Sequence, residues 1–208
     1  ASTLNLSPEQ IHAAQKINET ENGFSVALLD GVTGSGKTEV YFELVKKQIL
    51  LGRQCLILLP EIVLTTSWVN RFKKWVGFMP NIWHSGISAG KKKRIWREIN
   101  EGHPGVVVGA RSALFLPFSN LGAIIVDEEH EAGYKQEEQV IYHARDMAIL
   151  RAKYADCSIV LATATPSLES WINVRNGRYQ HIILANRYGV ATMPDIQTID
   201  LRKFKPAF

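Results

Sequence analysis

The chain has 208 residues, of which 46% are hydrophobic and 21% are charged, and its formal net charge is +4. This length suits one α/β domain without room for a second, and the apolar content is too high for a disordered chain. No apolar run approaches the ~20 residues that cross a bilayer, and residues 1–10 lack a signal-peptide core. We therefore expect a cytoplasmic protein that has no membrane partner. The modest positive charge permits a polyanionic partner without establishing one.

Seven short apolar runs predict the strands of one sheet. They alternate with segments of helical spacing, which is typical of βαβ units and a parallel sheet. The runs at 56–59 and 124–126 are apolar throughout, as in strands that are buried on both faces. We therefore predict an α/β fold, a three-layer sandwich with a mainly parallel central sheet. The predicted strands are Phe24–Leu29, Cys55–Leu59, Asn81–Trp83, Val106–Val108, Ala123–Val126, Ile159–Leu161 and Tyr179–Leu184.

Three helices are predicted from capping residues and apolar spacing. Ser7 is a suitable N-cap for the first helix, and Gln10 stands at the third helical position, which together form a capping box. Gly52 marks the end of the second helix, and Ser88 is the expected N-cap of the third. The predicted helices span residues 7–20, 37–51 and 88–100.

The third predicted helix carries the most basic run of the chain, Lys91–Arg97. Its charges point round most of the helix, so we expect a solvated face rather than a DNA-binding patch. Ile95, Ile99 and Trp96 are expected to face inward, and the other tryptophans are expected in the core or at a contact with another lobe. The two cysteines lie in apolar runs and are expected to be buried, reduced thiols, which are too far apart in the sequence for a zinc site.

The strongest motif lies between the first predicted strand and the second predicted helix. Residues 31–38 fit the pattern G-x-x-x-x-G-K-[ST] of a phosphate-binding loop. Glycines let backbone N–H groups face a phosphate, and the following helix directs the positive end of its dipole at the same anion. We expect Lys37 to reach the β- and γ-phosphates and Thr38 to bind Mg²⁺. The expected nucleotide contacts are Gly31, Thr33, Gly34, Ser35, Gly36, Lys37 and Thr38.

A second motif, Asp127-Glu128-Glu129-His130, follows the apolar run at 123–126. In a P-loop fold the first acid after such a strand holds magnesium, and the next acid polarises an attacking water. Asp127 is therefore expected to be a metal ligand and Glu128 to be the catalytic group. With Lys37, these residues predict hydrolysis of a nucleoside triphosphate.

Two other functions of a phosphate loop remain open from these residues. A small-molecule kinase would use the same loop, but it would need an acceptor pocket that the sequence does not display. A DNA-binding module that is gated by nucleotide would not require the acid pair Asp127 and Glu128.

Further strings complete an ordered series of motifs. Residues 31–38 resemble motif I and residues 127–130 resemble motif II of the DExH helicases of superfamily two. The strings at 31–41, 84–86, 111–115 and 142–146 resemble the primosomal replication-restart helicases in particular. The strings that resemble motifs Ia, Ib and III are Pro60-Glu61-Ile62 with Thr65, Gly109–Phe115, and Thr163-Ala164-Thr165-Pro166.

This resemblance covers residues 6–201 and implies the first RecA-like lobe of an ATP-dependent DNA helicase. The helicase would move 3′ to 5′ along DNA and act in replication restart. Another double-stranded DNA translocase of the same superfamily is the nearest alternative. The expected domain spans residues 1–201, and residues 202–208 would begin the connection to a second lobe.

The resemblance also assigns roles to single residues. Gln10 matches a glutamine that reads adenine through paired hydrogen bonds, although a helix-capping role suits it equally. Thr163 and Thr165 match hydroxyl groups that connect hydrolysis to movement on DNA. His130 and Arg111, which lie in motifs II and Ib, are assigned to the same coupling and to DNA sensing.

Residues 134–146 have no clean helical or strand period and resemble the aromatic-rich loop of these helicases, which senses single-stranded DNA. Tyr134, Tyr142 and His143 offer stacking faces, and Lys135 and Arg145 are suited to contact phosphate. The alternative is that Tyr142 packs on the core and that Arg145 pairs with an acid.

The partners that the resemblance implies are ATP, Mg²⁺, single-stranded and forked DNA, other primosome proteins, a second RecA-like lobe and a zinc module. The sequence contains neither the second lobe nor the cysteine clusters of the zinc module. Hydrolysis in such motors takes place between lobes, and a missing arginine finger lowers the rate by about 10³ to 10⁵. We therefore expect these 208 residues alone to bind nucleotide, to hydrolyse it slowly and to unwind no DNA.

Overall fold

The computed structural model describes residues 6–19, 23–60, 63–138 and 140–188. Seven strands form one sheet in the order β3-β4-β2-β5-β8-β1-β9, and each neighbouring pair is parallel. These are the seven predicted strands, so the α/β class and the parallel sheet are confirmed. The strands are β1 (Ser25–Gly31), β2 (Gln54–Leu58), β3 (Asn81–Trp83), β4 (Gly105–Gly109), β5 (Leu121–Asp127), β8 (Ser158–Thr163) and β9 (Gln180–Leu184).

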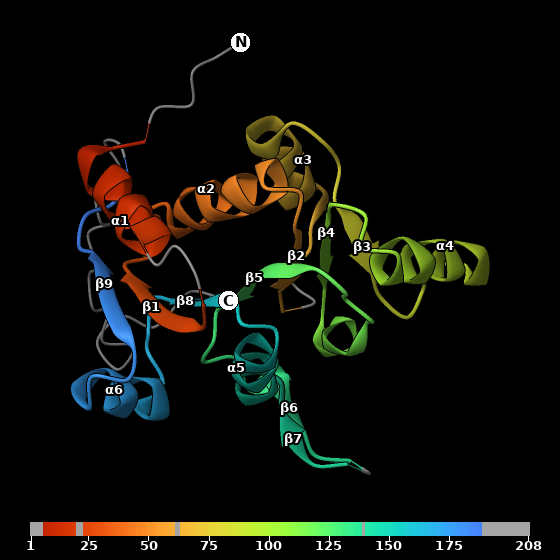
Figure 1. Ribbon diagram of the computed structural model, residues 1–208. Coiled ribbons are helices and arrows are strands. Elements are labelled where there is room, and N and C mark those ends of the chain that lie inside the picture. Colours follow the sequence, from red (N-terminus) through yellow and green to blue (C-terminus); the bar gives the residue numbers. More distant parts are fainter. Residues whose placement is uncertain (1–5, 20–22, 61–62, 139, 189–208) are drawn as a thin grey trace, which may run out of the picture.

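Helices cover both faces of the sheet, which confirms the three layers. α1, α2 and α3 lie over one face, whereas α5 and α6 lie over the other (Figure 1). A small antiparallel hairpin of β6 (Lys135–Gln136) and β7 (Tyr142–His143) extends away from the sheet next to α5. The helices are α1 (Pro8–Glu19), α2 (Lys37–Leu50), α3 (Thr66–Val76), α4 (Ala89–Asn100), α5 (Ala144–Tyr154) and α6 (Leu168–Arg175), and the 3₁₀ turns are η1 (Arg111–Phe115) and η2 (Ala132–Tyr134).

Two apolar cores lie on opposite sides of the sheet. Successive residues of a strand point to opposite faces. Leu29 and Ile57 therefore enter the core beneath α2, and Leu28 and Leu56 enter the core beside α5. All four side chains are fully buried, which explains why these strands are continuous apolar runs in the sequence.

The three predicted helices are confirmed, together with their caps. Ser7 donates its backbone N–H to Gln10 Oε1 at 2.8 Å, and the N–H of Gln10 is 3.2 Å from Ser7 Oγ, which is the expected capping box. Ser88 Oγ accepts from the N–H of Lys91, and Gly52 has the left-handed φ of 74° that follows many helix ends.

The basic helix α4 packs as predicted except at one residue. Ile95 and Ile99 are buried, but Trp96 is 50% exposed, so the expectation that it faces inward is wrong. The two isoleucines are four residues apart and therefore lie on the same helix face. The side chain of Trp96, the residue after Ile95, points about 100° away from this face around the helix axis. The cysteines, Cys55 and Cys157, are buried free thiols, as predicted.

Some expectations concern residues outside the described part of the chain. They are Glu61 and Ile62 of the string that resembles motif Ia, the end of the expected domain at 189–201, and the connection at 202–208. In the part that is described, no helix is long and apolar enough to cross a membrane.

Candidate functional site

The sheet brings three separate motifs to one edge. Strand β8 lies between β1 and β5, and all three run parallel. Asp30 at the end of β1 is paired with Thr163, and Asp127 at the end of β5 is paired with Ala162. The phosphate loop, the acidic motif and the Thr163–Pro166 string therefore begin side by side, at the sheet edge where α/β proteins bind ligands.

The phosphate loop has the conformation that its glycines predict. Gly34 and Gly36 have φ angles of 81° and 84°, in the left-handed region that glycine adopts without steric cost. Gly36 is also the N-cap of α2. Because glycine has no side chain, no side-chain hydrogen bond caps the start of this helix. The first N–H groups of α2 thus face the loop, where they suit an anion.

Lys37 and Ser35 close the loop from inside. The Lys37 ammonium is buried and donates to the carbonyl oxygen of Gly31 at 2.7 Å. Ser35 Oγ is buried and has no hydrogen-bond partner among the described residues. A cation, an unpaired hydroxyl group and open backbone N–H groups are the groups that bind phosphate, so this loop fits a nucleotide.

Asp127 lies beneath the loop and is only 6% exposed. The Tyr41 phenol of α2 donates to Asp127 Oδ2 at 3.0 Å. Burial, and then the neighbouring Glu128 carboxylate, raise the pKa of Asp127 to about 6. A hard divalent cation would offset both effects. Thr38 lies three residues before Tyr41 and thus on the same face of α2, so Thr38 and Asp127 fit the predicted pair of magnesium ligands.

Glu128 has a strained backbone. Its φ of 49° lies in the left-handed region, which is uncommon for a residue other than glycine. Its N–H lies 3.1 Å from Asp127 Oδ1, and its Oε2 lies 3.7 Å from His130 Nδ1. The Glu128 side chain is 34% exposed, so water can reach the carboxylate beside the phosphate loop.

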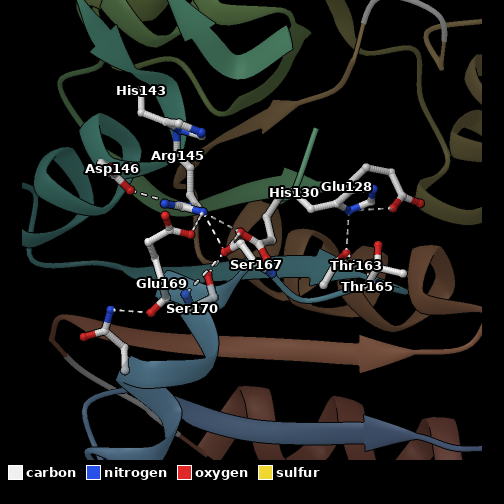
Figure 2. A network of polar contacts seen from close by, with 12 residues as sticks. Glu128, His130, His143, Arg145, Asp146, Thr163, Thr165, Ser167, Glu169 and Ser170 are labelled. Carbon is white, nitrogen blue, oxygen red and sulfur yellow. Dashed lines mark hydrogen bonds and ion pairs between the residues drawn. The ribbon is translucent and has the colours of Figure 1, made fainter. Parts of the chain in front are cut away.

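His130 connects the acidic motif with the string at 163–166. Its Nδ1 lies 2.7 Å from Thr163 Oγ1, and the same Oγ1 accepts from the N–H of Thr165 at 3.0 Å (Figure 2). Thr163 is buried, whereas Thr165 is exposed. The geometry therefore brings together three of the residues that the sequence assigned to coupling.

Glu129 forms a buried polar centre on the other side of the motif. One of its carboxylate oxygens accepts from the N–H of Ser167 at 2.7 Å. The other accepts from the hydroxyl groups of Ser167 and Ser170 and from the Arg145 guanidinium at 3.0 Å. Figure 2 shows Arg145 pointing from the start of α5 towards Ser167 and Ser170 of α6. Glu129 therefore joins the end of β5 to the first residues of two helices.

Two residues that were expected to contact DNA are buried instead. Tyr134 is 2% exposed, and its phenol donates to the carbonyl oxygens of Asp127 and Leu58 at 2.7 and 3.0 Å. Arg145 is 5% exposed and pairs with Glu129, which is the alternative that the sequence left open. The expectation that Tyr134 stacks on a base and that Arg145 contacts phosphate is wrong for this conformation.

The remaining residues of the expected aromatic-rich loop are more accessible. Tyr142 packs edge-on against Phe115 with ring centroids 5.5 Å apart, and His143 caps α5 by accepting from a backbone N–H. Lys135 is exposed and pairs with Glu137 at 2.7 Å, while Arg111 donates to the backbone oxygen of Lys135. Arg111, Lys135 and the β6–β7 hairpin therefore form one surface, on which DNA contact stays a prediction.

Gln10 is buried against the phosphate loop. Its Nε2 donates to the carbonyl oxygen of Ser35 at 2.9 Å, while its Oε1 accepts from Ser7 in the capping box. The capping role is thus present, and the same side chain also touches the phosphate loop. Its contact with adenine stays a prediction.

The geometry of this sheet edge agrees with the similarity of the chain to known proteins. Residues 7–173 match the family of DEAD/DEAH box helicases. The chain belongs to the DEAD/DEAH box helicases. This membership leaves the kinase alternative without support.

Similar members of this helicase family are replication restart proteins. PriA of Rickettsia felis is 47% identical over 200 residues, which cover 96% of this chain and 30% of that protein. PriA of Bacillus subtilis is 46% identical over 202 residues, which cover 96% of this chain and 25% of that protein. The chain therefore spans less than a third of the length of these relatives. RecG bound to a three-way DNA junction shares the fold, with a TM-score of 0.64 and 21% identity over 88% of this chain and 24% of RecG.

The sequence interpretation did not identify four residues that the structure places in the candidate site. Tyr41 lies one turn after Thr38, and this spacing is the signal that places its phenol near Asp127. Glu129 was noted only as the third carboxylate of its motif. The possible pairing of Arg145 with an acid pointed towards it but did not identify which acid. Ser167 and Ser170 carried no signal, because hydroxyl groups at a helix start are common caps.

Proposed function

We propose that the chain is the ATP-binding lobe of an ATP-dependent DNA helicase that acts in replication restart. One observation carries this proposal: a phosphate loop with open backbone N–H groups lies at the same sheet edge as the Asp127–Glu128 pair. The similarity to PriA proteins supports replication restart as the process. ATP and Mg²⁺ are the proposed cofactors, and single-stranded or forked DNA is the proposed track.

In the proposed reaction, Lys37 leaves the Gly31 carbonyl and binds the β- and γ-phosphates. Thr38 and Asp127 would hold Mg²⁺, which would neutralise phosphate charge. Glu128 orients the attacking water and accepts its proton. The Glu128 carboxylate suits this task because its side chain is partly exposed, so that water can reach it. Its closeness to His130 also connects the carboxylate with Thr163.

Movement on DNA is proposed to depend on the hydrogen bonds that link His130 to Thr163 and Thr163 to Thr165. The second lobe, the zinc module and other primosome proteins are proposed partners of the longer protein. Since an arginine finger from another lobe completes such sites, we propose that these 208 residues hydrolyse ATP slowly on their own and unwind no DNA.

Titration with a fluorescent adenine nucleotide tests the site. Lys37→Ala removes the buried cation, and we expect it to weaken nucleotide affinity by at least about tenfold. A matched control is Lys47→Ala, because Lys47 lies in the last turn of the same helix, far from the loop. Equal affinity of the Lys37→Ala variant and the unmodified chain would contradict the proposed site. Repeating the titration with single-stranded DNA measures whether this lobe alone couples the two ligands.

A further inference from the structure

Tyr41 is a fully buried residue of α2, one helical turn after the phosphate loop. Its phenol donates to Asp127 Oδ2 at 3.0 Å. Its ring packs edge-on against that of Phe42, with ring centroids 5.2 Å apart. The ring is therefore held by the core beneath α2, while the hydroxyl group is directed at a carboxylate that is proposed to bind metal.

The phenol and one backbone N–H together fix the Asp127 carboxylate. Tyr41 donates to Oδ2, and the N–H of Glu128 lies 3.1 Å from Oδ1. An ionised carboxylate has about four acceptor positions, so each oxygen keeps room for a further partner. The carboxylate is thus held at both oxygens without being saturated, which is how neighbouring groups orient a metal ligand.

Thr38 and Trp68 adjoin the same phenol. Burial, followed by the Asp127 carboxylate, raises the pKa of Tyr41 above its usual value, whereas interactions with the Trp68 and Thr38 side chains lower that pKa. A side chain that lowers the pKa of a phenol by hydrogen bonding directs a donor at the phenol oxygen. A Thr38 hydroxyl group that donates its proton in this direction keeps its lone pairs for Mg²⁺.

The Trp68 indole N–H makes no regular hydrogen bond within the described residues, although it is buried. Trp68 is 6% exposed, and its ring stacks on Phe72 and packs edge-on against Phe42. The ring therefore has little freedom to turn. Because an indole N–H can only donate, it can approach Tyr41 only at the lone pairs of the phenol oxygen, and the phenol proton then stays directed at Asp127.

We propose that Tyr41 is a positioning residue whose phenol orients both groups that would hold Mg²⁺, the Asp127 carboxylate and the Thr38 hydroxyl, and that Trp68 orients the phenol. Tyr41 contacts neither metal nor nucleotide in this assignment and acts through the two ligands. This inference rests on the proposed nucleotide-binding function. It extends that function to α3, because Trp68 connects this helix with the metal ligands.

The test measures ADP binding to the 208-residue chain by calorimetry, in EDTA and over a series of free Mg²⁺ concentrations. Tyr41→Phe keeps the ring and removes the donor. Loss of a group that orients a metal ligand typically weakens metal affinity by about 10- to 100-fold. We therefore expect the Mg²⁺ concentration that half-saturates the gain in ADP affinity to rise by at least about tenfold. The affinity for ADP in EDTA should stay the same, because Lys37 and the backbone N–H groups of the loop are unchanged.

Tyr179→Phe is the matched control, since it removes a phenol that packs against the other core, beside α5. This variant should keep the Mg²⁺ dependence of the unmodified chain. Trp68→Phe should raise the half-saturating Mg²⁺ concentration less than Tyr41→Phe does, and it should have no further effect in the Tyr41→Phe background, because Trp68 acts through the phenol. Additive effects of the two changes would contradict the role of Trp68.

Two results would overturn the role of Tyr41 while leaving the proposed function intact. One is an unchanged Mg²⁺ dependence in Tyr41→Phe. The other is a loss of ADP affinity in Tyr41→Phe that is equal in EDTA and in Mg²⁺, since this would show a general structural role. If the unmodified chain does not bind ADP, or binds it without any effect of Mg²⁺, the proposed function fails together with this inference.

Discussion

Asp127 is a buried carboxylate whose charge is costly unless a cation stands beside it. Tyr41 donates to it and Lys37 lies near enough to lower its pKa, yet burial and Glu128 raise that pKa from 3.8 to about 6. The same carboxylate that suits a metal ion therefore destabilises the fold when it is ionised without one. Function and stability oppose each other at this residue.

We predict a pH-dependent gain in stability for Asp127→Asn. A carboxyl group whose pKa is higher in the folded state stabilises the fold below its unfolded pKa, and this stabilisation is lost as the pH rises through the folded pKa. The rise from 3.8 to about 6 is worth about 3 kcal/mol. Urea unfolding in EDTA should show the free energy of unfolding of the variant, relative to the unmodified chain, increasing by up to that amount from pH 4 to pH 8.

The exposed residue Glu138 supplies the control for this titration. Glu138→Gln also removes one carboxylate, but its side chain lies at the surface, where the loss of one charge should change the unfolding free energy by at most about 1 kcal/mol. A difference between Asp127→Asn and the unmodified chain that stays constant from pH 4 to pH 8 would show that burial does not raise the pKa of Asp127.

At the scale of elements, Glu129 makes three pieces of structure depend on each other. Glu129 lies two residues after the end of β5, and its carboxylate contacts the start of α5 through Arg145 and the start of α6 through Ser167 and Ser170. The β6–β7 hairpin runs directly into α5, which begins with Ala144 and Arg145. A displacement of the hairpin would therefore move Arg145 and change its ion pair with Glu129.

A double-mutant cycle measures this connection. Glu129→Gln leaves the Arg145 guanidinium without its buried counter-ion, and Arg145→Met leaves the buried carboxylate without its cation, so each should cost about 3 to 5 kcal/mol of unfolding free energy. Removing both charges should cost less than the sum of the single changes by at least about 1 kcal/mol. Additive costs in urea unfolding would contradict a shared ion pair.

Asp146→Asn is the control for the cycle, because Asp146 also pairs with Arg145 but is 59% exposed. An exposed pair of this kind contributes at most about 1 kcal/mol. A cost for Asp146→Asn as large as that for Glu129→Gln would mean that burial is not what makes the Glu129 pair important.

The elements differ in how far the sequence could predict them. All seven strands of the large sheet were predicted from short apolar runs, and the runs of β2 and β5 are continuous because these strands are buried on both faces. Helix α5 was not, since it buries the small residues Ala144, Ala148 and Ala152 and its N-cap is His143, which is an uncommon cap. The phosphate loop and Asp127 were predicted because their chemistry dictates a fixed spacing. The Glu129 centre depends on contacts between distant segments, which no local pattern encodes.

At the scale of the whole molecule, one parallel sheet separates two apolar cores and should make them unfold together. Cys55 lies in the core beneath α2, and Cys157 lies in the core beside α5. Burial raises the pKa of both thiols, that of Cys157 to about 12, so neither forms much of the reactive thiolate at pH 8. The two cysteines therefore report on the two cores separately.

We predict that both thiols become reactive at the same urea concentration. The single-cysteine variants Cys55→Ala and Cys157→Ala each leave one reporter, and a chromogenic disulfide at pH 8 measures its rate of labelling. Because every strand of the sheet contributes side chains to both cores or borders one that does, loss of packing in one core weakens the strands that line the other. Midpoints that coincide, after correction for the stability of each variant, indicate one cooperative unit. A thiol that reacts well before the main transition would show that the α1–α3 layer and the α5–α6 layer open independently.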